Sequence, residues 1–180
     1  MLITITKLYS RLHEFIHENF QINIPGLGFL LRQIKNDFSI KFPNGKLWFN
    51  HKIADNYGRL INGRFNEKET HLFLNKIFQN RNDYSFVDIG ANVGEFMLDY
   101  SSRKEIVKRV FLFEPQKEQI KALKETIKIN NFNHCDLIEK AVSNKTGTLR
   151  FNVNSINTTA SGISHDNSSN VIVETTTIDE

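Results

Sequence analysis

The sequence has 180 residues, of which 39% are hydrophobic and 24% charged, the balance of a folded globular protein. Its 23 Lys and Arg residues stand against 20 Asp and Glu, and a net charge of +3 is too weak to indicate a nucleic-acid or membrane-surface partner. There is no apolar run of about 18 residues, no signal segment, and only one cysteine, Cys135, so we expect a cytoplasmic protein with no disulfide and no membrane span.

The first predicted element is a helix over residues 6–20. Leu8, Leu12, Phe15 and Ile16 recur at the spacing i, i+4, i+7 and i+8, which places them in one apolar stripe. We therefore expect this stripe to pack against the rest of the chain.

The same helix contains His13-Glu14-Phe15-Ile16-His17, which matches the H-E-x-x-H pattern of zinc proteases. In one large zinc-protease group a glycine and a third histidine follow at fixed positions, where this chain has Phe20 and Asn23. A polar helix edge is the better interpretation, and we expect no metal site. A zinc hydrolase acting through His13 and His17 is a remote alternative.

Residues 29–34 predict a short second helix. Residues 38–42 and 47–49 alternate apolar and polar side chains on either side of Asn44-Gly45, which predicts a β-hairpin. Residues 51–65 predict an irregular connection.

A third helix is expected to begin at Asn66, since Asn66 and Glu69 form an N-cap and N3 pair. The predicted apolar face of this helix consists of Thr70, Phe73, Leu74, Ile77 and Phe78. Arg81-Asn82-Asp83 ends it and leads into the central strand.

The centre of the sequence is a strand, a glycine turn and a helix. Residues 86–89 form a short apolar run typical of a strand buried on both faces, and Gly90 and Gly94 interrupt it before a helix that reaches about Tyr100. A second strand at residues 110–114 ends in Glu114. Such βα units bind nucleotide-like cofactors at the carboxyl edge of a parallel sheet.

The rest of the chain predicts a helix after Pro115 and three more strands. That helix buries Ile120, Leu123 and Ile127, and the strands fall within residues 137–142, 147–153 and 171–178. Residues 154–170 are rich in Asn, Ser and Thr and predict a loop.

The glycine turn suits some cofactors better than others. A dinucleotide needs G-x-G-x-x-G, and Asn92 occupies the position of the second glycine, which disfavours a close pyrophosphate. S-adenosylmethionine has no phosphate; Asp88 would lie near its amino group, and Glu114 would accept from its ribose hydroxyls. The alternative is that Gly90 and Gly94 merely close a βα turn.

Five blocks of the sequence resemble the FkbM-type methyltransferases and come in the order of that family. They are Phe86-Val87-Asp88-Ile89-Gly90-Ala91-Asn92-Val93-Gly94, then Phe113-Glu114-Pro115, then Asn130-Asn131, then Ala141-Val142-Ser143 with Gly147 and Phe151, and finally residues 173–179. The resemblance implies an α/β fold with a class I Rossmann-like sheet, S-adenosylmethionine as cofactor, and O-methylation of a hydroxyl on a sugar or natural product.

The resemblance also implies which residues bind the cofactor. Those lining its methionine end would be Asp88, Gly90, Ala91, Asn92 and Gly94. Glu114 would hold the ribose, and residues 139–141 would border the adenine. It names no general base, although His51, Tyr57 and Arg59 precede the cofactor region and are candidates to reach a small-molecule or glycan acceptor.

The chain departs from the family at its end, where members continue into a further strand of the form Lys-x-Asp-x-Glu-Gly. We therefore expect a truncated domain at residues 66–180, with strands in the order 3-2-1, and an α+β extension at residues 1–65. The strand at residues 85–90 becomes an apolar parallel edge. An inactive or partner-dependent cofactor-binding fragment is the alternative to an active enzyme.

Overall fold

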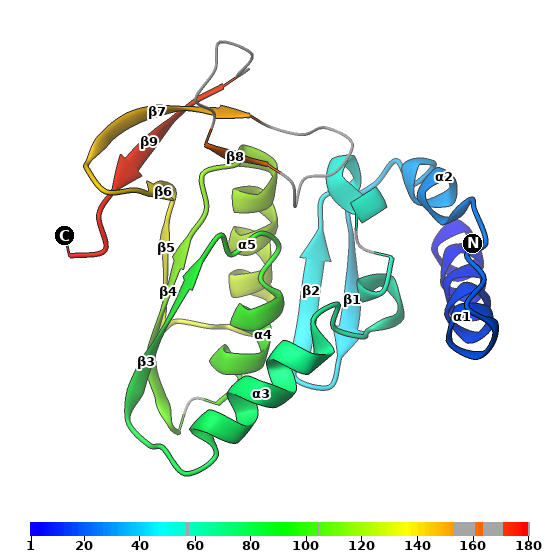
Figure 1. Ribbon diagram of the computed structural model, residues 1–180, viewed down its shortest axis with the longest axis horizontal. Helices are drawn as coiled ribbons and strands as arrows, with labels where there is room; N and C mark the ends of the chain where they lie inside the picture. The colour runs from blue at the N-terminus through cyan, green and yellow to red at the C-terminus, as the bar shows by residue number, and fades with distance from the viewer. Residues whose placement is uncertain (57, 104, 153–160, 164–170, 180) are drawn as a thin grey trace.

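The computed structural model describes all residues except 57, 104, 153–160, 164–170 and 180. The described elements form successive layers (Figure 1): a parallel sheet, the helices α4 and α5, a β-hairpin, and the helices α1 and α2 at the amino-terminal end. No helix of the described part of the chain is both long and apolar enough to cross a membrane.

The helices and strands have the following bounds. The helices are α1 (Leu2–Phe20), α2 (Leu27–Arg32), the 3-10 helices η1 (His51–Asn56) and η2 (Leu60–Asn62), α3 (Lys68–Phe78), α4 (Glu95–Ser101) and α5 (Lys117–Asn130). The strands are β1 (Phe38–Phe42), β2 (Gly45–Phe49), β3 (Tyr84–Ile89), β4 (Val107–Phe113), β5 (Cys135–Ile138), β6 (Ala141–Val142), β7 (Gly147–Asn152), β8 (Gly162–Ile163) and β9 (Val171–Thr176).

Strands β3, β4 and β5 form a parallel sheet in the order β3-β4-β5. In chain order these are the first, second and third core strands, so the predicted order 3-2-1 is confirmed. The mixed α/β class is confirmed as well, while the class I Rossmann-like assignment stays a prediction. Among the described strands, β3 pairs only with β4, and it therefore forms the expected parallel edge.

The two faces of this sheet differ in burial. Helices α4 and α5 lie against one face, where Val110 and Leu112 of β4 are fully buried. On the other face, Val87 and Ile89 of β3 are 46% and 56% exposed. The prediction that this strand is buried on both faces is wrong, because the described helices cover one face alone.

One hydrophobic core joins the first 65 residues to the rest of the chain. It is formed by buried side chains from residues 31–61, among them Leu47, Phe49 and Leu60, together with Val93, Leu98, Ala122 and Phe132. The backbone N–H of Trp48 also donates to Thr126 Oγ1 of α5 at 2.9 Å. The division at residue 65 stays a prediction, and buried side chains from both sides of it belong to this core.

The predicted hairpin is confirmed, and its register places Phe38 opposite Phe49 and Phe42 opposite Gly45. Its two-residue turn is Pro43-Asn44 instead of Asn44-Gly45, and Gly45 begins β2 with φ 149°. A Cβ at Gly45 would lie 2.5 Å from Asn130 Oδ1. The glycine therefore serves the close packing of the hairpin on α5.

Two helices bury faces that differ, wholly in α1 and in part in α3, from those predicted. In α1, Leu8 and Phe15 are 70% and 60% exposed, while Thr6 and Ser10 are buried. In α3, Phe73 is exposed and His71 is buried, whereas Leu74 and Phe78 of the predicted face pack against the core. The prediction for α1 was wrong and that for α3 was correct only in part, because polar hydrogen bonds as well as apolar contacts determine which side of each helix faces the protein.

The amino end of α3 also differs from the prediction. The helix begins at Lys68, and Asn66 is not its N-cap. Instead, Asn66 Nδ2 donates to Glu95 Oε2 at 3.3 Å. A tertiary contact with α4 thus replaces the local cap.

The strand predicted within residues 137–142 is two strands in two sheets. β5 ends at Ile138, and β6 belongs to a second sheet with the order β6-β9-β7-β8. Most of the predicted loop at residues 154–170 lies outside the described residues, and Gly162–Ile163 within it forms β8.

Candidate cofactor site

A cleft of about 420 Å³ lies where the carboxyl ends of β3 and β4 meet β6. We call it the cleft throughout. Its lining residues are Glu67, Ile89, Gly90, Asn92, Phe113, Glu114, Pro115, Gln116, Lys140, Ala141, Val142, Phe151, Ser161 and Gly162. Three predicted site residues, Gly90, Asn92 and Glu114, therefore come together, and so do Lys140 and Ala141 of the segment predicted to border an adenine.

The glycine turn after β3 is held by backbone hydrogen bonds to the next strand. The N–H groups of Gly90 and Ala91 donate to Phe113 O at 2.9 and 3.1 Å. Gly90 has φ 81°, and an added Cβ there would meet no atom within 4 Å. Asn92, at φ 52°, also has a left-handed conformation, which Asn tolerates better than most residues. The turn therefore leaves open space beside Gly90.

Glu114 is fixed in the wall of the cleft by two backbone donors. Its Oε2 accepts from the N–H of Asn92 and its Oε1 from the N–H of Gln116, each at 2.9 Å. Only 2% of the residue is exposed. Burial raises the pKa of Glu114 although the two N–H groups act in the opposite direction. Each oxygen keeps a further lone pair with which to accept from a ligand hydroxyl.

Asp88, in β3, is not among the residues that line the cleft, and it carries a carboxylate oxygen without a partner among the described residues. Its Oδ2 is buried and has no hydrogen bond to any described residue. Burial raises the pKa of Asp88 to about 7, and the neighbouring carboxylates of Glu114, Glu67 and Glu95 act in the same direction. A cation placed beside these acids would favour the ionised form of Asp88.

Gly94 and Ala91 lie behind the cleft and do not line it. A Cβ at Gly94 would come within 2.5 Å of Met97 Cε and 3.0 Å of Leu123 Cδ2, so a glycine is needed for helix packing. Ala91 is buried and lines a neighbouring cavity of about 90 Å³. The cofactor contact expected of these two residues stays a prediction.

Comparison with known protein families bears on this region. The family model named Methyltransferase FkbM domain matches residues 88–180. The chain belongs to the FkbM methyltransferase family. Every predicted site residue from Asp88 to Glu114 lies within the matched part, and the FkbM domain indicates a methyltransferase. No curated protein matched the chain.

One acidic residue of the cleft, Glu67, escaped sequence analysis of this FkbM chain. Glu67 precedes the matched domain, and its position follows from a tertiary contact, because its N–H donates to Glu95 Oε1 at 3.1 Å. Lys140 enters the cleft because the chain leaves one sheet after β5 and joins another at β6. No local sequence signal indicates the position of Glu67, whereas Lys140 belongs to residues 139–141, the segment that the resemblance implied would border an adenine.

A buried histidine lies behind Glu95. His71 Nδ1 is 2.9 Å from Asp99 Oδ2, and its Nε2 is 3.4 Å from Glu95 Oε1. The ring is stacked between Phe65 and Phe96, with centroid distances of 4.2 and 4.4 Å. Burial by itself lowers the pKa of His71, but the carboxylates of Asp99 and Glu95 outweigh it and raise the pKa to about 9. His71 is therefore an imidazolium at neutral pH.

The H-E-x-x-H motif lies outside the FkbM match, on α1. The rings of His13 and His17 are nearly parallel with centroids 6.3 Å apart. Glu14, which would be the general base of a zinc protease, pairs with Arg64 at 3.1 Å. The described residues include no group of three or more His, Cys, Asp or Glu side chains suited to a metal ion.

The three residues considered as acceptor contacts have different positions. His51 Nδ1 lies 2.7 Å from Asp37 Oδ1, so this imidazole contacts a carboxylate of the extension. Tyr57 lies outside the described residues. Arg59 lines a second cavity, which adjoins α1.

Proposed function

We propose that this FkbM chain binds S-adenosylmethionine in the cleft and transfers its methyl group to a hydroxyl of a sugar or other small molecule. The observation that carries the proposal is the pair of acids at the ends of β3 and β4. Glu114 is immobilised by two backbone donors, and Asp88 presents a buried oxygen without a described partner.

The charge of the cleft supports this cofactor over a dinucleotide. S-adenosylmethionine carries a sulfonium and an ammonium group, which the carboxylates of Asp88, Glu114 and Glu67 would attract. A pyrophosphate would instead be repelled. The Asn92 N–H, which a pyrophosphate would need, already donates to Glu114.

In this proposal, each part of the cleft has one task. Glu114 would accept from the ribose hydroxyls, Asp88 would face the amino group, and the open space beside Gly90 would admit the methionine end. Lys140 and Ala141 would border the adenine.

When bound, S-adenosylmethionine would supply a methyl group activated by a sulfonium. Methyl transfer is an in-line displacement, so the main task of the protein is to align donor and acceptor and to exclude water.

Calorimetric titration with S-adenosylmethionine tests the proposal. The full chain should bind it in the micromolar range, and Glu114→Ala should weaken binding by about tenfold or more, since charge-assisted hydrogen bonds contribute roughly 1.5–3 kcal/mol. Glu125→Ala on α5 removes a carboxylate outside the cleft and should leave binding unchanged.

The outcomes separate the proposal from its details. A folded wild-type chain that does not bind S-adenosylmethionine would overturn the proposed function. Unchanged affinity in a folded Glu114→Ala variant would overturn the ribose contact alone. Circular dichroism of each variant excludes loss of fold as the cause.

The exposed outer face of the β3-β4-β5 sheet favours a second candidate, a cofactor-binding chain that is inactive by itself. Parallel sheets are normally covered on both faces, whereas Val87 and Ile89 are exposed here. This candidate predicts binding of S-adenosylmethionine without methyl transfer to any hydroxyl acceptor. A transfer assay with radiolabelled cofactor and a panel of sugars distinguishes the two.

A further inference from the structure

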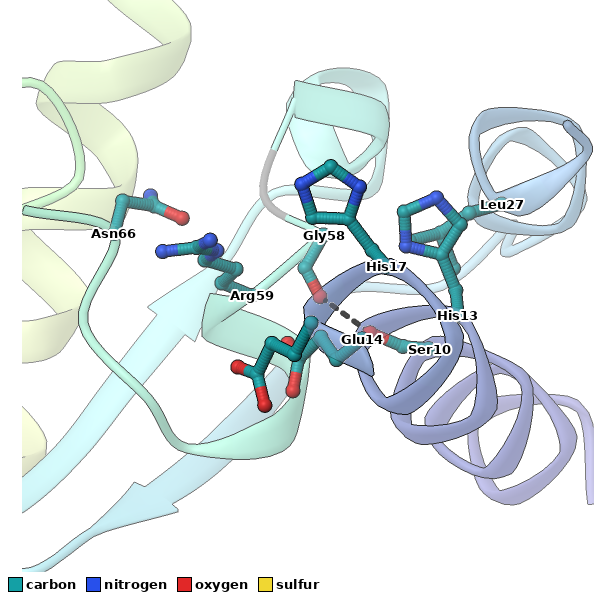
Figure 2. Close-up of a pocket in the computed structure, with 9 residues that line it drawn as sticks. Ser10, His13, Glu14, His17, Leu27, Gly58, Arg59 and Asn66 are labelled. Carbon is teal, nitrogen blue, oxygen red and sulfur yellow. Dashed lines mark hydrogen bonds between the residues drawn. The ribbon is translucent and has the colours of Figure 1, made fainter. Parts of the chain in front are cut away.

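A second cavity, of about 350 Å³, lies between α1 and the segment that leads to α3. We call it the α1 groove. Its lining residues are Ser10, His13, Glu14, His17, Glu18, Leu27, Gly58, Arg59 and Asn66. Figure 2 shows Arg59 lying between the imidazole of His17 and the amide of Asn66.

The groove gathers hydrogen-bond donors. Two imidazoles from successive turns of α1 face it together with the guanidinium of Arg59. His17 Nδ1 is buried and makes no hydrogen bond to a described residue. A ring nitrogen enclosed in this way needs a partner, and a ligand in the groove would supply one.

The acidic residues of the groove offset these donors only in part. Glu14 already accepts from Arg64 Nη1 at 3.1 Å and from Asn62 Nδ2 at 3.3 Å, so its charge is compensated by the protein. Glu18 is exposed and contributes a solvated charge. Arg59 has the planar set of donors that binds carboxylates and phosphates in a bidentate manner.

The groove also adjoins the cleft. Asn66 lines both the groove and the cavity of about 90 Å³ behind the glycine turn. This cavity shares Glu67, Gly90 and Asn92 with the cleft. The groove and the cleft therefore both border this small cavity, the groove through Asn66 and the cleft through Glu67, Gly90 and Asn92.

We infer that the α1 groove is the acceptor subsite, and that it binds an anionic oxygen group, a carboxylate or a phosphate, of a hydroxyl-bearing acceptor. The inference rests on the proposed function and specifies its substrate class. Arg59 would hold the anionic group, His17 would donate a further hydrogen bond, and the hydroxyl to be methylated would extend past Asn66 toward Gly90.

Nuclear magnetic resonance titration of the full chain tests this inference. The probes are glucose 6-phosphate, glucuronate and glucose, and the observed signals are the imidazole protons of His13 and His17. We expect glucose 6-phosphate, glucuronate or both to shift these signals in a saturable manner, and glucose to shift neither. Binding of the phosphate alone or of the carboxylate alone identifies which group the site takes.

A pair of arginine variants provides the control. Arg59→Gln should weaken binding of the anionic sugar by about tenfold or more, as expected for a lost charge-assisted contact. Arg11→Gln removes an exposed arginine of α1 that does not line the groove, and it should leave binding unchanged.

Several results would overturn the inference. Equal binding of glucose, no binding of either anionic sugar, or equal effects of the two arginine variants would show that the groove does not select anions. Stoichiometric Zn²⁺ binding that is lost in His17→Asn would make the groove a metal site instead. Titration of the same samples with S-adenosylmethionine separates the two proposals, because its binding depends on the cleft alone.

Discussion

The cleft and the α1 groove lie close together but differ in charge and in the way they are built. The cleft is acidic, and backbone N–H groups fix its walls, as the two that donate to the side-chain carboxylate of Glu114 illustrate. The groove contains imidazoles and a guanidinium, and it forms only where α1 packs against residues 58–66.

The comparison shows that the edge of a sheet is enough to form the cleft, whereas the groove requires tertiary packing of a helix. Strand ends of a parallel sheet meet at one edge, whatever surrounds them. The groove instead depends on one helix face, which is held in place by the hydrogen bond from Ser10 Oγ to Gly58 O at 2.8 Å. The cleft should therefore tolerate changes in α1 that alter the groove.

Two glycine substitutions test the packing behind the cleft and should give the largest effect. Gly94→Ala should destabilise the protein by about 3 kcal/mol, the sum of left-handed backbone strain and overlap with Met97 and Leu123. Gly90→Ala has the strain without the overlap and should cost about 1 kcal/mol. Urea unfolding measures both, and equal losses would contradict the assignment of Gly94 to helix packing.

His71 tests the support of Glu95, which accepts hydrogen bonds from Asn66 of the groove and Glu67 of the cleft. His71→Gln should lower the free energy of unfolding at neutral pH by on the order of 2 kcal/mol, since it removes a buried imidazolium from Asp99 and Glu95. Its raised folded pKa of about 9 gives the sign. The contribution is complete below the unfolded pKa of about 6.5 and is lost as pH rises through 9.

Urea unfolding of wild type and His71→Gln at a series of pH values measures this contribution. The difference between the two proteins should shrink as pH rises toward about 10. A constant difference across that range would mean that the charge of His71 adds nothing, and that only its stacking between Phe65 and Phe96 does.

Asp88 tests the acidity of the region beside the cleft, because its carboxyl group interacts with those of Glu114 and Glu67. A cofactor cation beside Asp88 should lower its pKa from about 7, so affinity for S-adenosylmethionine should rise as pH is raised toward 7 and then level off. If the bound cofactor lowers this pKa by about 1, the total rise in affinity should be about tenfold. In Asp88→Asn this pH dependence of the affinity should disappear. Calorimetry in matched buffers measures the affinity, and a pH dependence that persists in the variant would contradict the prediction.

Ser10 tests the groove alone and should give the smallest effect. Ser10→Ala removes the donor to Gly58 and the acceptor for Asn62 Nδ2, and it should cost about 1 kcal/mol of stability. Binding of anionic sugars should weaken while S-adenosylmethionine affinity is retained. If both affinities fall together, the two sites are not built independently.

Much of the fold could be predicted from the sequence where local patterns coincide with tertiary contacts. The hairpin, the three parallel strands and the turn at Gly90 follow from alternation, apolar runs and glycine spacing. The meeting of Gly90, Asn92 and Glu114 in one cleft follows from the geometry of parallel strands.

The errors occurred where distant residues satisfy polar groups. The apolar stripe of α1 did not reveal that Ser10 would be buried by a hydrogen bond to a residue 48 positions away. The apolar pattern of α3 did not indicate that His71 would be buried, because its burial depends on Asp99 and Glu95 of α4. The wall residue Glu67 was missed for the same reason, since Glu95 places it.

The shared hydrophobic core limits how this chain can change over time. Leu47, Phe49 and Leu60 pack in the same cluster as Val93 and Phe132. A genetic crossover between residues 65 and 66 would combine one part of this core with side chains from a different protein. Side chains whose volumes do not match destabilise a close-packed interior. The segments on either side of that point must therefore be inherited together, and a substitution in one selects for compensation in the other.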